Sequence, residues 1–258
     1  MENKIELYLG DCLEILPTLE DNSIDAVIAD PPFNLGKNYS DSVDDSMDLN
    51  DYYDWCNKWI NLCFRLLKPG GTFYLMTIQN HVGKIMGFMD QHGQLRNQII
   101  WFNSSMPVKN RFCIGYQPIL YYIKNGGDFT FNYGYEKRKS DAALPWGRKN
   151  KGHSIKDIWD DIPFVSGGCM VSKEAILEID TKKKVHPAQM PIGLAIRAIG
   201  YSTNKNEFIL DPFMGICTTG VACIQMERNF VGIEIVPKYF EMAEKRIAEA
   251  QLQMRFDL

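Results

Sequence analysis

The sequence predicts an α/β fold with a doubly wound, mostly parallel sheet. Short apolar runs of strand length recur along the chain, at residues 24–29, 72–77, 99–102, 119–123, 207–210 and 230–233. Segments with a helical spacing of apolar residues lie between several of them. Alternation of strands and helices favours parallel strands joined by helical connections.

The bulk numbers fit one large α/β domain, or such a core with an insertion. The chain has 258 residues, of which 45% are apolar and 23% charged. Neither a signal peptide nor an apolar run of membrane-spanning length is visible, so we expect a cytoplasmic protein without a membrane segment. Seven cysteines without paired spacing fit a reducing compartment, and four scattered histidines argue against a metal site.

The elements of the first half follow from their sequence patterns. The run 24–29 is a buried strand that ends at two prolines. In the helix 51–67, Trp55, Trp59, Leu62 and Leu66 share one face, and Lys68-Pro69-Gly70-Gly71 ends it. A strand at 72–77, a helix at 79–92 and two further buried strands at 99–102 and 119–123 complete this half.

The regular pattern resumes near residue 187. A helix to about 200 precedes the strand 207–210, a glycine-containing loop and a helix that ends near 226. The strand 230–233 then ends at Glu234, and Pro237 stands at the first position of the last helix, which runs to about 253. Strand, loop, helix, strand and acid in this order are typical of a nucleoside site, where the acid binds the ribose hydroxyls.

The most informative motif is Asp30-Pro31-Pro32-Phe33, directly after the first buried strand. Two consecutive prolines have no N–H, so their carbonyls lack local donors. A carboxylate, a free carbonyl and an aromatic ring at the carboxyl end of a strand suit a flat base with an exocyclic amino group. The acid and the carbonyl can accept the two amino hydrogens while the ring stacks on the base.

The middle of the chain, residues 125–182, has a different composition and is expected to be a loop-rich insertion. Basic and aromatic residues alternate there, although the net charge of the whole chain is −4. A solvated surface segment would account for this pattern, but a local basic cluster also favours a polyanion. The candidate nucleic-acid-binding residues are Lys137, Arg138, Lys139, Arg148, Lys149 and Lys151.

Both halves together resemble the β-class of S-adenosylmethionine-dependent DNA amino-methyltransferases. Asp30-Pro31-Pro32-Phe33 matches the Asp-Pro-Pro-Tyr/Phe motif of that family, and the cofactor motif follows it in the chain. The matching cofactor blocks are Leu9-Gly10-Asp11-Cys12-Leu13, His186-Pro187-Ala188-Gln189-Met190-Pro191, Asp211-Pro212-Phe213-Met214-Gly215 with Thr218-Thr219-Gly220, and Val231-Gly232-Ile233-Glu234-Ile235.

The resemblance implies a permuted, Rossmann-like, seven-stranded sheet, with a catalytic core of 1–124 and 183–258 and a target recognition region at 125–182. It also implies double-stranded DNA as substrate and S-adenosylmethionine as cofactor. The catalytic residues are then Asp30, Pro31, Pro32 and Phe33. The implied cofactor-binding residues are Asp11, Cys12, Asp30, His186, Gln189, Asp211, Phe213, Gly215, Thr218, Thr219 and Glu234.

Three positions depart from the family pattern. Ile216-Cys217 stands where the family has a small residue and glycine, Ala188 replaces a threonine, and Met190 replaces a lysine. If position 217 needs a positive φ, a cysteine there costs about 1 kcal/mol or more. Its side chain would also crowd the methionine part of the cofactor. These departures leave open a weakly active or inactive DNA-binding homologue.

The target base and the partners are less narrowly defined by the sequence. No cysteine follows a proline, which argues against covalent cytosine-C5 chemistry. Asp at the first motif position favours adenine N6 as target, with cytosine N4 as the second choice, and RNA or a protein glutamine remains a further substrate class. Relatives in this class are often dimers, so the helix 51–67 is a candidate for a homodimer face or for the core. The sequence leaves open the DNA site and a cognate restriction endonuclease.

Overall fold

The computed structural model describes residues 3–36, 38–40, 43–102, 110, 112–133, 135, 155–167, 170–171, 174, 176 and 189–256. The strands are β1 (Ile5–Leu9), β2 (Ile24–Ala29), β3 (Asn38–Ser40), β4 (Val43–Asp44), β5 (Leu67–Met76), β6 (Gly93–Phe102), β7 (Tyr116–Lys124), β8 (Ile158–Trp159), β9 (Ser166–Gly167), β10 (Met170–Val171), β11 (Phe208–Asp211) and β12 (Asn229–Glu234). The helices are α1 (Cys12–Ile15), the 3₁₀ turn η1 (Leu16–Thr18), α2 (Leu49–Leu66), α3 (Val82–Met89), α4 (Ile192–Ser202), α5 (Thr218–Gln225) and α6 (Pro237–Phe256).

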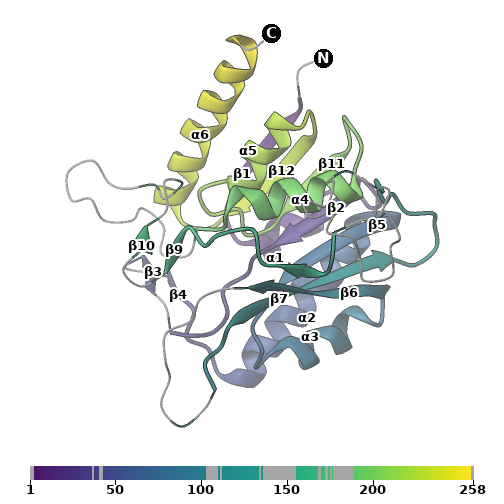
Figure 1. The fold of residues 1–258 in the computed structure, drawn as a ribbon, viewed down its shortest axis with the longest axis vertical. Helices are drawn as coiled ribbons and strands as arrows, with labels where there is room; N and C mark the ends of the chain where they lie inside the picture. The colour runs from purple at the N-terminus through teal and green to yellow at the C-terminus, as the bar shows by residue number, and fades with distance from the viewer. Residues whose placement is uncertain are drawn as a thin grey trace, which may run out of the picture.

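Among the described residues, eight strands form the main sheet in the order β1-β12-β11-β2-β5-β7-β6-β8 (Figure 1). The neighbours from β1 to β5 pair in parallel, and β7 runs antiparallel to both β5 and β6. The prediction of a doubly wound, mostly parallel sheet is therefore confirmed. Seven strands were expected, and the described residues add an eighth, β8, which pairs with β6 and comes from within the segment expected as the insertion.

Helices cover both faces of this sheet, with α4, α5 and α6 on one side and α2 and α3 on the other (Figure 1). The two cores follow the alternation of buried strand residues. In β2, Ala26 and Ile28 belong to the first core while Val27 and Ala29 belong to the second. The runs that read as continuously apolar are thus strands buried on both faces.

Helix α2 belongs to the core. It begins at the N-cap Asp48, whose carboxylate accepts from the N–H of Asn50 across 2.9 Å. Trp59 is fully buried and packs on Phe73 and Phe213. Of the two roles that the sequence left open for this helix, the described structure shows burial in the core.

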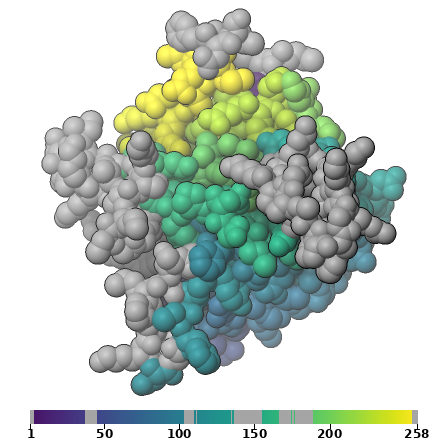
Figure 2. All heavy atoms as spheres, viewed as in Figure 1, coloured from purple at the N-terminus to yellow at the C-terminus, as the bar shows by residue number. Residues whose placement is uncertain are grey.

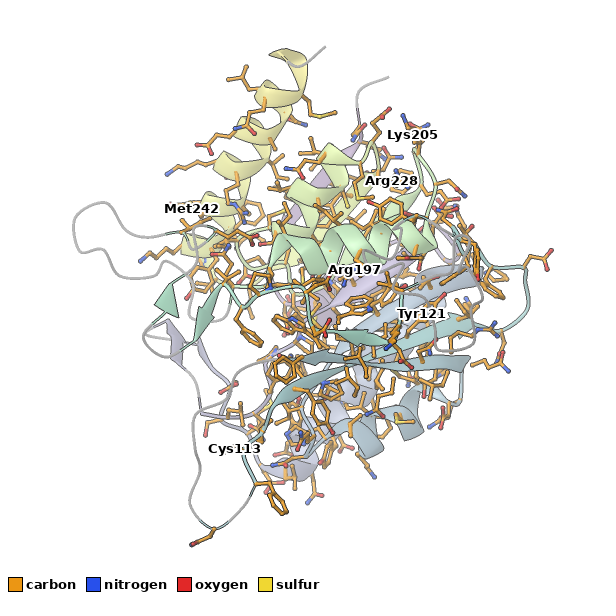
Figure 3. The ribbon with its side chains drawn as sticks, in the orientation of Figure 1. Cys113, Tyr121, Arg197, Lys205, Arg228 and Met242 are labelled. Carbon is orange, nitrogen blue, oxygen red and sulfur yellow. The ribbon has the colours of Figure 1, made fainter. Side chains whose placement is uncertain are left out.

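The described segment 155–167 is fastened to the sheet and to α4. The indole N–H of Trp101 donates to the carbonyl of Ile162 across 2.8 Å, and its ring stacks on Phe164 at 3.9 Å. Arg197 of α4 makes two 2.8 Å hydrogen bonds to the carboxylate of Asp161. Arg197 lies on the side of the sheet that α4 covers, as does Tyr121 of β7 (Figure 3). Atoms of this fastened segment are visible at the centre of the face shown in Figure 2.

A helix needs about 20 predominantly apolar residues to cross a bilayer. Within the part of the chain that the structure describes, no helix is long and apolar enough to do so.

Candidate functional site

The carboxyl ends of four neighbouring parallel strands meet at one edge of the sheet, where a cavity of about 210 Å³ lies. Ligands bind at this edge in open α/β sheets. Its lining includes all four residues of the motif after β2, namely Asp30, Pro31, Pro32 and Phe33. It also includes Asp11, Cys12, Phe213, Gly215 and Glu234 from the ends of β1, β11 and β12. The structure thus brings the candidate catalytic motif and much of the candidate cofactor motif into one cavity.

Asp30 reaches the cavity because β2 lies in the middle of the sheet. Ala29, its last residue, pairs with Leu75 of β5, and the prolines that follow end the pairing. Phe33 lines the cavity and also packs against the core under α4, and this packing restrains its side chain.

Glu234 ends β12 and is only 8% exposed. The N–H of Val236 donates to its carboxylate across 2.7 Å, and the backbone N–H groups of Gly215 and Ile235 also favour its charged form. Burial outweighs these bonds and raises the pKa of Glu234 above its ordinary value. A buried carboxylate at the cavity wall is suited to accept hydrogen bonds from a pair of hydroxyl groups.

Asp11 and Cys12 stand beside Glu234, because β1 and β12 pair so that Leu9 is opposite Glu234. Asp11 is the N-cap of α1 and accepts from the N–H of Leu13 across 2.8 Å. Cys12 is buried, and burial raises the pKa of its thiol far above the usual range. The thiol is therefore a neutral part of the wall at neutral pH.

Asp211 does not line the cavity but holds the loop that does. It accepts from the N–H of Phe213 across 3.0 Å and from the hydroxyl of Thr219 across 2.6 Å. Burial raises the pKa of this carboxyl to about 7, against the effect of both bonds. Thr218 is also buried, and its hydroxyl oxygen accepts from Arg246 of α6.

The remaining predicted residues lie elsewhere or outside the described residues. The side chain of Gln189 bonds to the carbonyl of Glu174 and the N–H of Ile176, and it does not line the cavity. His186 and the basic cluster of Lys137, Arg138, Lys139, Arg148, Lys149 and Lys151 lie outside the described residues. Their roles, and those of Asp211, Thr218, Thr219 and Gln189 toward a cofactor, stay predictions.

Cys217 adopts the left-handed backbone conformation, with φ 63° and ψ 44°. A non-glycine residue there is strained by about 1 kcal/mol or more. Its side chain, however, is fully buried in the core under α4, α5 and α6 rather than in the cavity. A Cβ on Gly220 would lie 2.4 Å from the Cys217 sulfur, which shows how closely the two pack. This thiol is therefore not part of the cavity lining.

Sequence reasoning missed Trp55 and Tyr239, which also line the cavity. The ring of Trp55 lies 5.5 Å from that of Phe213, so two aromatic side chains form part of one wall. Trp55 appeared in the sequence only as part of an apolar helix face, and nothing local distinguishes it from a core residue. Aromatic walls beside Asp11 and Glu234 fit a nucleoside, which has a flat base and a ribose with two hydroxyls.

Comparisons with known proteins identify a family and a fold. The family model described as DNA methylase, for N6 and N4 methyltransferases, matches residues 24–245. The chain is 31% identical to the Type II methyltransferase M.HpaI of Haemophilus parainfluenzae, over 93% of this chain and 73% of that protein. It is 30% identical to the DNA adenine methyltransferase YhdJ of Escherichia coli K12, over 92% and 81%.

Two solved structures are similar in fold. The M1.HpyAVI–SAM complex has a TM-score of 0.66 at 25% identity, over 94% of this chain and 98% of that one. The cytosine-N4-specific PvuII DNA methyltransferase has a TM-score of 0.70 at 18% identity, over 98% and 93%, a similarity of fold alone.

Proposed function

Because the chain belongs to the N6/N4 DNA methylase family, we propose that it methylates the N6 amino group of adenine within a specific DNA sequence. Membership itself makes the chain a DNA methyltransferase that depends on S-adenosylmethionine. One observation carries the proposal further: Asp30 and Pro31 line the same cavity as Glu234. A base presented to the motif would therefore lie beside the bound cofactor.

The residues of the cavity fit S-adenosylmethionine, which supplies a methyl group made electrophilic by a sulfonium. Glu234 would accept hydrogen bonds from the ribose hydroxyls, as its buried and N–H-supported carboxylate allows. Phe213 and Trp55 would contact the adenine of the cofactor, with Asp11 and Cys12 at its edge. Gly215, with φ 53°, lets the loop turn without a side chain next to the ligand.

The exocyclic amino group is a poor nucleophile because its lone pair is delocalised into the ring. Asp30 and the carbonyl of Pro31 would accept its two hydrogens and favour a pyramidal nitrogen. The lone pair of this nitrogen would then be free to attack the electrophilic methyl group in line with its bond to sulfur. The Asp30 carboxylate would stabilise the positive charge that develops on nitrogen and take up a proton. Phe33 would stack on the base, which must leave the duplex to reach the cavity.

Two observations support adenine over cytosine N4. The first residue of the motif is Asp30, and serine is the commoner choice in cytosine-N4 enzymes. A relative named as a DNA adenine methyltransferase is 30% identical over most of both chains. Cytosine N4 is the second candidate, since the same carboxylate and carbonyl could accept hydrogens from either amino group.

We extend the proposal to the partners. Residues 125–182 would form the recognition region, and its basic cluster would contact DNA phosphates. Type II methyltransferases among the relatives support a restriction-modification role with a cognate endonuclease in the cytoplasm. A homodimer remains a proposal that sedimentation of the purified protein would test.

The direct test is incubation of the protein with S-adenosylmethionine and genomic DNA, followed by mass spectrometry of the digested nucleosides. N6-methyladenine supports the proposal, N4-methylcytosine selects the second candidate, and neither base from a folded protein would contradict both. In Asp30→Asn, which removes the charge but keeps the size, we expect transfer to fall at least about 100-fold.

A further inference from the structure

The two carbonyls that follow Pro31 in the catalytic motif are held by side chains from other parts of the chain. The hydroxyl of Tyr52, on α2, donates to the carbonyl of Pro32 across 3.1 Å. The Nε2 of His81, from the loop before α3, bonds to the carbonyl of Phe33 across 3.2 Å. Tyr52 belongs to the core on the α2 side of the sheet, and Pro32 and Phe33 line the cavity.

The two hydrogen-bond partners of His81 determine which of its ring nitrogens carries the hydrogen. A carbonyl can only accept, so Nε2 must carry the hydrogen. The Nδ1 of a neutral ring then accepts from the hydroxyl of Tyr53, which lies 3.0 Å away. Burial lowers the pKa of His81, which keeps the ring neutral at pH 7.

Ring packing holds this group of three side chains in place. The ring of His81 lies 5.0 Å from that of Tyr52 and meets Tyr53 edge-on at 5.5 Å. Tyr52 is only 3% exposed and His81 only 7%. Neither side chain can swing into solvent without breaking these contacts, so both donors are fixed in direction.

We propose that Tyr52 and His81, oriented by Tyr53, are positioning residues that fix the Asp-Pro-Pro-Phe loop for methyl transfer. A segment with two consecutive prolines cannot fix itself by local N–H bonds, because the N–H groups are missing. Tyr52 and His81, which lie outside the motif, donate hydrogen bonds to the carbonyls of Pro32 and Phe33. The carbonyl of Pro31 accepts no hydrogen bond within the described residues, which leaves it available to the target amino group.

Two further hydrogen bonds hold the residue that directly follows the motif, Asn34. The side-chain amide of Asn34 donates to the carbonyl of Met47 across 3.0 Å, and its oxygen accepts from the N–H of Met47 across 2.7 Å. Met47 lines the cavity just before α2 begins. The loop is therefore held at Pro32, Phe33 and Asn34, and its reacting groups are Asp30 and Pro31.

This inference rests on the proposed function for its effect on catalysis, but the holding of the loop can be measured without activity. Hydrogen–deuterium exchange of a peptide covering 30–36 reports the amides of Phe33, Asn34, Leu35 and Gly36. In Tyr52→Phe and in His81→Phe, we expect exchange of this peptide to be about tenfold faster, with exchange of α2 unchanged. His81→Gln, which keeps an N–H donor, should restore slower exchange.

The second measurement is the single-turnover rate of methyl transfer in the same variants, beside the dissociation constant for S-adenosylmethionine. Misplacement of the reacting groups by about 1 Å lowers rates by about 100-fold. We expect falls of about 10- to 100-fold in rate with cofactor affinity within about twofold, and recovery in His81→Gln. The matched control is Tyr122→Phe, which removes a hydroxyl bonded to Asp90 at 2.6 Å in the same core but away from the loop.

Unchanged exchange of 30–36 in Tyr52→Phe, or an equal increase in Tyr122→Phe, would overturn the inference. Faster exchange without any fall in rate would overturn the catalytic part. If the wild-type protein transferred no methyl group to DNA, the proposed function would fail. The exchange data would then still decide whether Tyr52 and His81 hold the loop.

Discussion

The hydroxyl of Thr219 donates to the carboxylate of Asp211 across 2.6 Å, and the two side chains are 0% and 4% exposed. This contact joins the end of β11 to the first turn of α5 and closes the loop that carries Phe213 and Gly215 to the cavity. The sequence suggests that Asp211 contacts the cofactor, but in the structure its carboxylate accepts a hydrogen bond from Thr219.

The raised pKa of Asp211 makes stability depend on pH. The change from 3.8 to about 7 corresponds to about 4 kcal/mol. The folded protein holds this proton between about pH 4 and 7 while the unfolded chain has lost it, so the free energy of unfolding falls as pH rises through this window. Above about pH 7 the folded protein has also released this proton, and the contribution of Asp211 to the free energy of unfolding is fully lost.

Asp211→Asn tests this linkage, because the amide keeps the size of the side chain and does not titrate. We expect the decline between pH 4 and 7 to be smaller in the variant by an amount on the order of 4 kcal/mol. Urea denaturation at several pH values measures the difference. Equal slopes in the two proteins would show that Asp211 has an ordinary pKa.

Glu234→Gln should weaken S-adenosylmethionine binding. Hydrogen bonds to a charged group contribute about 1.5–3 kcal/mol, so the expected loss is roughly 10- to 150-fold. Because burial raises the pKa of Glu234, affinity in the wild-type protein should also fall as pH drops and the carboxylate is protonated. Calorimetric titration should show this fall in the wild type and a flat pH profile in Glu234→Gln.

Cys217 offers a test of backbone strain. Cys217→Ala and Cys217→Gly remove the same buried sulfur, but only glycine adopts φ 63° without strain. We expect Cys217→Gly to be the more stable of the two by about 1 kcal/mol, the reverse of the order usual within a helix. The midpoints of urea denaturation measure the difference in stability between the two variants. Equal stability of Cys217→Ala and Cys217→Gly would argue against a left-handed backbone conformation at this position.

Arg197→Lys should loosen the segment 155–167. Arg197 makes two bonds to Asp161 and lies 5.1 Å from the ring of Trp159, an arrangement that a single ammonium does not reproduce. We expect a loss of about 1–2 kcal/mol in stability and faster hydrogen exchange in 158–165. Lys205→Met is the control, since its ion pair with Glu227 is exposed and contributes little.

Much of the fold could be predicted from local patterns. Apolar runs such as 24–29 and 230–233 are strands in the structure, because a strand buried on both faces leaves a continuous apolar signature. The direction of β7 could not be predicted in this way. Tyr121 pairs with Tyr74 in antiparallel register, and such pairing depends on where the chain returns rather than on the residues of the strand.

The sequence by itself determined the order of most elements from residue 24 onward, but it did not predict β1. Asp30 and Glu234 directly follow predicted strands, and parallel strands bring their carboxyl ends together. Asp11 was expected at the site only through the family resemblance. Only the tertiary structure decided which acids face the cavity and which, like Asp211, hold a loop. It also decided that the Cys217 sulfur points into the core and that Tyr52 and His81 reach the catalytic carbonyls. The physical reason is that side-chain direction and long-range hydrogen bonds depend on residues distant in sequence, which local patterns do not record.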